Sequence, residues 1–159
     1  MKYALSGLEP ALFATLFAMN DDELASVGAQ RVVADADRGF ACRIRLADAG
    51  LGESLILINH LSHDVRGLFR TPYAIYVAER AVAPARYVDA LPEGLTTRPL
   101  SSRAFDRDRM IVTATLTIAG MGDAAIRLLF ANARVAYIMA HFAAYGCFAA
   151  RVERHGEEA

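Results

Sequence analysis

The chain has 159 residues, of which 55% are hydrophobic and 22% are charged, a composition that excludes an intrinsically disordered protein. Its formal net charge of −1 argues against the strongly basic surface that nucleic acids and anionic membranes attract. Two distant cysteines, Cys42 and Cys147, exclude a disulfide framework and a CxxC metal or redox motif.

The sequence also shows no targeting or membrane signal. Ser6, Glu9 and Pro10 interrupt the amino-terminal segment, so it lacks the apolar stretch of a secretory signal. No apolar run is long enough to span a membrane. We therefore expect a single cytoplasmic domain over residues 1–159, with free thiols.

The amino-terminal part predicts one short strand followed by two helices. Residues 3–8 fit a strand, and Pro10 suits the first turn of a helix, where its missing N–H is not needed. Asn20 and Glu23 have the spacing of a capping box for a second short helix. Gly28 is placed to end that helix.

The central part of the chain predicts a β-rich structure. In the segment 42–46, Cys42, Ile44 and Leu46 alternate with Arg43 and Arg45, which predicts a strand with one buried face and one solvated face. Residues 61–71 read as a polar loop. The strands expected here span residues 30–34, 42–46, 54–58, 72–78, 100–105 and 110–118, with a hairpin turn at 106–109.

The carboxy-terminal part predicts a helix and then a pair of strands. Residues 120–123 break the preceding strand, and Asp123 fits the N-cap of a helix that ends near Asn132. An apolar strand, a tight turn and a returning strand follow within residues 135–154. Because hairpin turns outnumber helical crossovers, we expect an α+β fold with a mostly antiparallel β-sheet and helices packed on one face.

The last strand pair carries the most suggestive chemistry, His141 and Cys147. A thiolate beside a histidine is the basic unit of cysteine nucleophile chemistry, so these two residues are candidate catalytic groups. Whether they meet depends on the parity of the turn between them. A loop of three or five residues would place both side chains on one sheet face, and a loop of two or four would place them on opposite faces.

A second candidate site consists of arginines from three predicted strands. Arg43, Arg103 and Arg151, together with His60, would form an anion-binding pocket if they converge on one face. The competing interpretation is three surface arginines whose stems cover the sheet. His60 and His63 have an HxxH spacing without a third ligand nearby, so we expect no metal site and no cofactor.

Several sequence fragments, taken in their order and spacing, resemble one family across nearly the whole chain. The fragments are Cys42-Arg43-x-x-Leu46-x-Asp48-Ala49, Gly52-Glu53, Ser102-Arg103-Ala104-Phe105-Asp106, Arg134-Val135-Ala136-Tyr137, and His141 with Gly146-Cys147-Phe148-Ala149-Ala150-Arg151-Val152. They are similar to the bacterial family known as domain of unknown function 1203. The resemblance implies a single small bacterial domain, and it implies no activity and no catalytic residues.

Two function classes remain open at the level of the sequence. The first is a noncatalytic small-molecule-binding or interaction domain, whose partners would be a small anionic ligand or a second copy joined through an apolar sheet edge or face. The second is a small enzyme that acts on an acidic metabolite through His141, Cys147 and the arginines. We favour the first class because no acid–base or metal motif is specific, and we expect no nucleic-acid or membrane partner.

Overall fold

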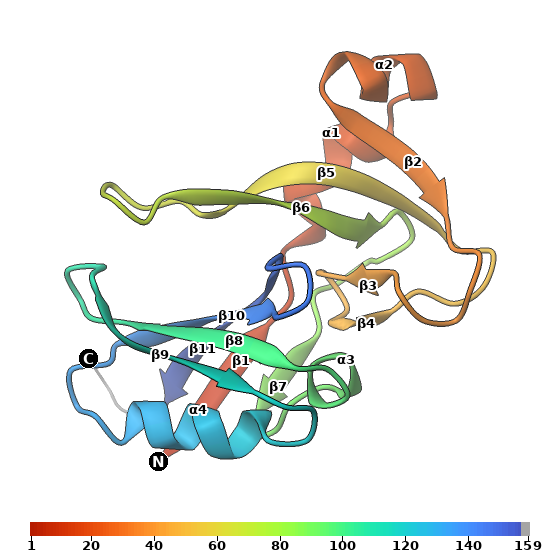
Figure 1. The fold of residues 1–159 in the computed structure, drawn as a ribbon. Helices are drawn as coiled ribbons and strands as arrows, with labels where there is room; N and C mark the ends of the chain where they lie inside the picture. The colour runs from red at the N-terminus through yellow and green to blue at the C-terminus, as the bar shows by residue number, and fades with distance from the viewer. Residues whose placement is uncertain (157–159) are drawn as a thin grey trace.

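The computed structural model describes residues 1–156 and arranges their strands in two mostly antiparallel β-sheets (Figure 1). The larger sheet has the strand order β7-β1-β11-β10-β8-β9, and the smaller has the order β2-β5-β6-β3-β4. The strands of the larger sheet are β1 (Lys2–Ser6), β7 (Arg86–Val88), β8 (Leu100–Phe105), β9 (Ile111–Thr117), β10 (Tyr137–Phe142) and β11 (Phe148–His155). Those of the smaller sheet are β2 (Ala29–Val33), β3 (Ala41–Cys42), β4 (Ala47–Asp48), β5 (Ser54–His63) and β6 (Thr71–Ala78).

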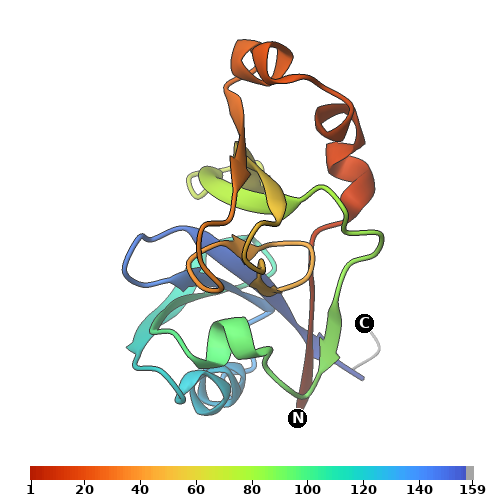
Figure 2. The same cartoon turned by 90° about the vertical axis from the view of Figure 1, so that its right-hand side faces the viewer.

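Short helices lie outside the two sheets. They are the 3₁₀ helix η1 (Pro10–Phe13), α1 (Ala14–Phe17), α2 (Asp21–Ser26), α3 (Glu93–Thr96) and α4 (Gly122–Phe130). In both views α2 lies at the end of the molecule that holds the smaller sheet, and α4 lies at the opposite end, beneath the larger sheet (Figure 1, Figure 2). The α+β class and the mostly antiparallel pairing are confirmed. The helices, however, are divided between two ends of the molecule and do not gather on one face.

Local signals explain the helix and hairpin ends that the sequence predicted. The capping box is confirmed, because the Asn20 side chain accepts from the Glu23 N–H and the Glu23 carboxylate accepts from the Asn20 N–H. The hairpin between β8 and β9 is closed by the Asp106 carboxylate, which accepts from the Met110 N–H at 2.9 Å. Arg109 adopts a left-handed conformation in that turn, with φ of 66°.

Three local predictions were wrong. Residues 43–46 form a turn and not a strand, with the Leu46 N–H bonded to the Cys42 carbonyl oxygen. Residues 61–63 continue β5, so the loop is shorter than expected. The N-cap of α4 is Met121, so Asp123 is the second residue of the helix, and its carboxylate is bonded to Arg127 and to the Tyr3 hydroxyl.

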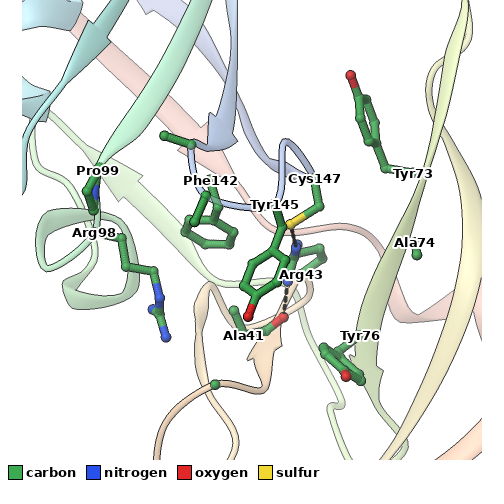
Figure 3. Close-up of a pocket in the computed structure, with 13 residues that line it drawn as sticks. Ala41, Arg43, Tyr73, Ala74, Tyr76, Arg98, Pro99, Phe142, Tyr145 and Cys147 are labelled. Carbon is green, nitrogen blue, oxygen red and sulfur yellow. Dashed lines mark hydrogen bonds between the residues drawn. The ribbon is translucent and has the colours of Figure 1, made fainter.

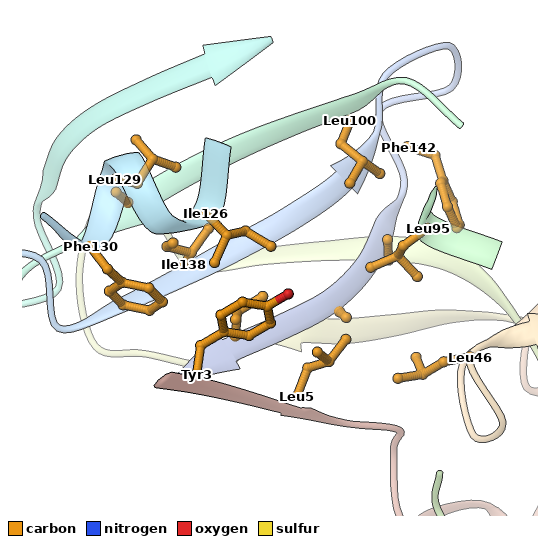
Figure 4. Packing of buried hydrophobic residues seen from close by; sticks show 14 of the residues in the cluster. Tyr3, Leu5, Leu46, Leu95, Leu100, Ile126, Leu129, Phe130, Ile138 and Phe142 are labelled. Atoms are coloured by element: carbon orange, nitrogen blue, oxygen red, sulfur yellow. The ribbon is translucent and has the colours of Figure 1, made fainter. Parts of the chain in front are cut away.

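Strand β10 divides the buried side chains into two hydrophobic clusters. Ile138 and Phe142 belong to one cluster, in which Ile138 lies beside Ile126 of α4 and Phe142 lies near Leu95 (Figure 4). Alternate residues of the same strand, Tyr137 and Met139, face a second cluster that joins the two sheets. From the smaller sheet this second cluster takes Leu55, Ile56, Ile75 and Val77.

No helix within residues 1–156 is long and apolar enough to cross a membrane.

Candidate functional site

A cavity of about 470 Å³ opens beside the turn that joins β10 to β11, on the side that faces β3 and β6 (Figure 3). Its walls come from segments far apart in the sequence, which the fold brings together. The lining residues are Gly39, Ala41, Arg43, Tyr73, Ala74, Tyr76, Arg98, Pro99, Phe142, Ala143, Ala144, Tyr145 and Cys147.

Arg43 owes its position to the turn that follows β3. Its N–H donates to the Tyr76 carbonyl oxygen at 2.9 Å, and its own carbonyl accepts from the Leu8 N–H at 2.8 Å. The turn packs so tightly against Gly7 that a Cβ there would lie 1.8 Å from the Ile44 carbonyl oxygen. The backbone of Arg43 is therefore fixed from both sides, and the side chain is directed toward the cavity (Figure 3).

The Arg43 side chain is 3% exposed, and within residues 1–156 it has no carboxylate partner. Its Nε donates to the Phe148 carbonyl oxygen at 2.6 Å, and one terminal nitrogen donates to the Ala41 carbonyl oxygen. The other terminal nitrogen lies 3.2 Å from Cys147 Sγ. Burial of the guanidinium lowers the pKa of Arg43 below its ordinary value. Among the described residues the guanidinium is thus held by two carbonyl oxygens and a sulfur atom, and no carboxylate balances its charge.

Arg98 reaches the same cavity, but its charge is balanced. One terminal nitrogen lies 2.7 and 2.6 Å from the two carboxylate oxygens of Asp48, and the other donates to the Gly94 carbonyl oxygen at 2.9 Å. The guanidinium carbons of Arg98 and Arg43 lie 5.2 and 5.0 Å from the centre of the Phe142 ring, which stands between them in Figure 3. Arg98 was not among the residues predicted from the sequence. Its pairing with Asp48 spans 50 positions, and no local motif indicates it.

Aromatic rings form much of the remaining wall. Tyr73 and Tyr76 come from alternate sides of β6, and Tyr145 comes from the β10–β11 turn, where it is 90% exposed. The Tyr73 hydroxyl accepts from a terminal nitrogen of Arg103 at 2.9 Å. Together with Phe142, these rings give the cavity an apolar and aromatic surface around one unneutralised cation.

His141 lies in a different cavity, of about 200 Å³, between β5, β8 and β10. It is 3% exposed, and its Nδ1 is 3.1 Å from the Met139 carbonyl oxygen, so this nitrogen carries the proton that it donates. Burial, and then the nearby charge of Arg103, lower the pKa of His141 to about 4. The imidazole is therefore neutral at neutral pH.

His141 and Cys147 leave the terminal hairpin on opposite faces. His141 pairs in register with Phe148, and both lie with the rings that join the two sheets. Cys147 packs against the other cluster and lines the larger cavity. Five residues, 143–147, connect β10 to β11, a loop length that was expected to place both side chains on one face. That expectation was wrong because His141 pairs with Phe148, the neighbour of Cys147, next to a register shift between Ala140 and His141. Within the described chain no hydrogen bond joins the thiol to the imidazole.

The other predicted ligand-binding residues are spread over the molecule. Arg103 lines the cavity of His141 and reaches the larger cavity only through the Tyr73 hydroxyl. Arg151 lies over the Tyr137 ring at 4.1 Å and bonds to Glu153. His60 packs against Phe13, and burial lowers its pKa. Of the four, Arg43 alone lines the larger cavity.

His63, the partner of His60 in the HxxH spacing, is occupied by other contacts. Its Nδ1 lies 2.8 Å from the Phe69 carbonyl oxygen, and its Nε2 lies 2.9 Å from the Tyr137 hydroxyl. Because the carbonyl can only accept, Nδ1 donates to it and Nε2 accepts from the tyrosine. Nε2 therefore joins the smaller sheet to the larger one, and Nδ1 holds the connection between β5 and β6.

The fold and the cavity define an α+β protein with two mostly antiparallel sheets and a buried arginine between them. The chain belongs to the family described as "Protein of unknown function (DUF1203)", whose model matches residues 39–154. Every residue that lines the larger cavity lies within the matched range. Comparisons with curated proteins and with solved structures gave no match.

Proposed function

We propose that this protein binds a small anionic ligand in the larger cavity, with Arg43 as the group that recognises the negative charge, and that it does so without catalysing a reaction. The observation that carries the proposal is the buried guanidinium without a carboxylate partner. Removing a charge from water costs several kcal/mol unless an opposite charge compensates it. A bound anion would supply that compensation.

The hydrogen bonds of Arg43 leave room for such a ligand. The Phe148 and Ala41 carbonyl oxygens and Cys147 Sγ each take one contact, and a guanidinium carries more N–H groups than these acceptors use. Arg43 also borders an open cavity of about 470 Å³, which lies within the usual range for small-molecule sites. A ligand can therefore reach the cation without any rearrangement of the fold.

The noncatalytic part of the proposal follows from the residue types in the cavity wall. Among the described residues that line it there is no histidine, aspartate or glutamate to act as a general base. The alternative, an enzyme that acts on an acidic metabolite through His141 and Cys147, has less support because those two side chains face different cavities. Cys147 meets Arg43 instead.

A thermal-shift screen of small anions tests the proposal. We expect at least one anion to raise the melting temperature of the wild-type protein and of Arg66→Gln, a matched control in an exposed loop. The same anion should have no effect on Arg43→Gln, which keeps a polar side chain and removes the charge. An anion that stabilises Arg43→Gln as strongly as the wild type would refute the role given to Arg43.

The cellular setting is also part of the proposal. Cys42 and Cys147 are both free thiols, which supports a reducing compartment such as a bacterial cytoplasm. The net charge of −1 supports the absence of a nucleic-acid partner. Localisation of a tagged copy by cell fractionation checks the first point, and recovery of the protein in the periplasmic fraction would contradict it.

A homodimer through the edge of the larger sheet is a separate proposal. Strand β9 lies at that edge, carries no charged residue, and exposes Leu116 by 73%. Edges without charge or proline readily pair with another strand. We expect light scattering to give a dimer mass for the wild type and a monomer mass for Leu116→Lys, and a wild-type monomer would remove the idea.

A further inference from the structure

The charges around the larger cavity determine how much negative charge a ligand can carry. Arg43 contributes one positive charge without a partner, whereas the charge of Arg98 is balanced by Asp48 at 2.6 Å. The other described residues in the wall include no lysine, histidine, aspartate or glutamate. The cavity therefore offers a net charge of +1.

The shape and composition of the wall determine the rest of the ligand. Tyr76, Phe142 and Tyr145 lie around Arg43, and Tyr73 lies farther away along β6 (Figure 3). Alanines and Pro99 complete the wall. Aromatic rings stack on one another and gain free energy beyond simple burial of area. A flat aromatic body therefore suits this wall better than a sugar or a flexible polar chain.

From these two observations we propose that the ligand is an aromatic carboxylic acid with a single negative charge, its carboxylate on Arg43 and its ring against the tyrosines and Phe142. This inference rests on the proposed function and narrows it to one ligand class. A carboxylate matches the planar guanidinium geometry. A phosphate monoester carries close to two negative charges at neutral pH, and the second would enter a poorly solvated space without a free cation.

Isothermal titration calorimetry with a matched series of probes tests the inference. The series is 2-naphthoate, 2-naphthyl phosphate and 2-naphthamide, which share one ring system and differ in charge, with acetate as the carboxylate that lacks a ring. For the wild type we expect 2-naphthoate to bind about tenfold or more tightly than each of the other three. In Arg43→Gln we expect 2-naphthoate and 2-naphthamide to bind equally weakly.

A second variant keeps the test decisive if Arg43→Gln fails to fold. Asp48→Asn removes the carboxylate that balances Arg98 but leaves an amide in its place. The cavity then offers a charge of +2, so we expect the affinity ratio of 2-naphthyl phosphate to 2-naphthoate to rise about threefold or more. An unchanged ratio would mean that the cavity charges do not select the ligand.

The outcomes separate this inference from the proposed function. Tighter binding of 2-naphthyl phosphate than of 2-naphthoate to the wild type, lost in Arg43→Gln, would overturn the single charge and leave anion binding intact. Equal affinity for acetate and 2-naphthoate would overturn the aromatic part alone. If no probe binds, the aromatic carboxylate is overturned, and the thermal-shift screen decides whether the cavity binds another anion. If 2-naphthamide binds as well as 2-naphthoate, both proposals fail.

Discussion

His141 should make the folded protein lose stability as the pH falls from neutrality toward 4. The pKa of the buried imidazole is lowered to about 4 from its ordinary value of 6.5. Below pH 6.5 the unfolded chain binds a proton at this residue and the folded protein does not, so protonation favours unfolding. The stabilising contribution is fully present above pH 6.5 and is lost as the pH falls through the folded pKa.

The magnitude follows from the two pKa values. Each pKa unit corresponds to about 1.4 kcal/mol, so the complete loss is about 3 kcal/mol and the loss at pH 5 is about 2 kcal/mol. No discount for solvent screening applies, since His141 is 3% exposed. Arg103 acts in the same direction because its positive charge opposes protonation, and His63 does so to a smaller extent.

Urea unfolding between pH 7.5 and pH 5 measures this effect. The matched variant is His141→Asn, which retains an N–H that can donate to the Met139 carbonyl oxygen but does not titrate. The free energy of unfolding of the wild type should fall by about 2 kcal/mol more than that of the variant. His60 also has a lowered pKa, but it is present in both proteins and cancels in the difference. Equal pH slopes for the two proteins would refute the reasoning.

Two further predictions concern the cavity itself. Iodoacetamide should label Cys147, which is partly exposed in the cavity wall, and spare Cys42, which is 0% exposed. Bound 2-naphthoate should slow the labelling of Cys147, and mass spectrometry of the two cysteine peptides measures both rates. Labelling of Cys42 at the same rate as Cys147 would contradict the buried position of Cys42. Gly7→Ala should destabilise the protein by about 2 kcal/mol or more and weaken ligand binding, because the new Cβ would displace the turn that holds Arg43. Gly50→Ala, with open space around it, should have neither effect, and urea unfolding of both variants measures the difference. A Gly7→Ala variant as stable as the wild type would contradict the tight packing of this turn.

The sequence predicted best where neighbouring residues determine the structure. The capping box of Asn20 and Glu23 and the β8–β9 hairpin at 106–109 both depend on contacts within a few positions. The alternation of apolar residues and arginines in residues 42–46 predicted a strand wrongly, because the same pattern is also compatible with a turn. The turn is selected by bonds from the Leu8 and Ala85 N–H groups, which lie far away in the sequence.

The candidate site was predictable only in part, for the same reason. Arg43 was named as a candidate anion-binding residue, but its burial depends on Phe148 and Cys147, more than 100 positions away. The pairing of Arg98 with Asp48 leaves no local signal, although it determines the charge of the cavity. The opposite faces of His141 and Cys147 follow from the pairing of His141 with Phe148, a register that the sequence did not reveal.

The most direct test of the account is an NMR titration of the arginine side-chain Nε–Hε signals with 2-naphthoate. The Arg43 signal, assigned by its absence in Arg43→Gln, should move in a saturable manner, and the signals of Arg66 and Arg151 should stay in place. Movement of the signals from residues in the cavity wall without movement of the Arg43 signal would show binding that does not use the buried cation. That result would contradict the central claim that Arg43 recognises an anion.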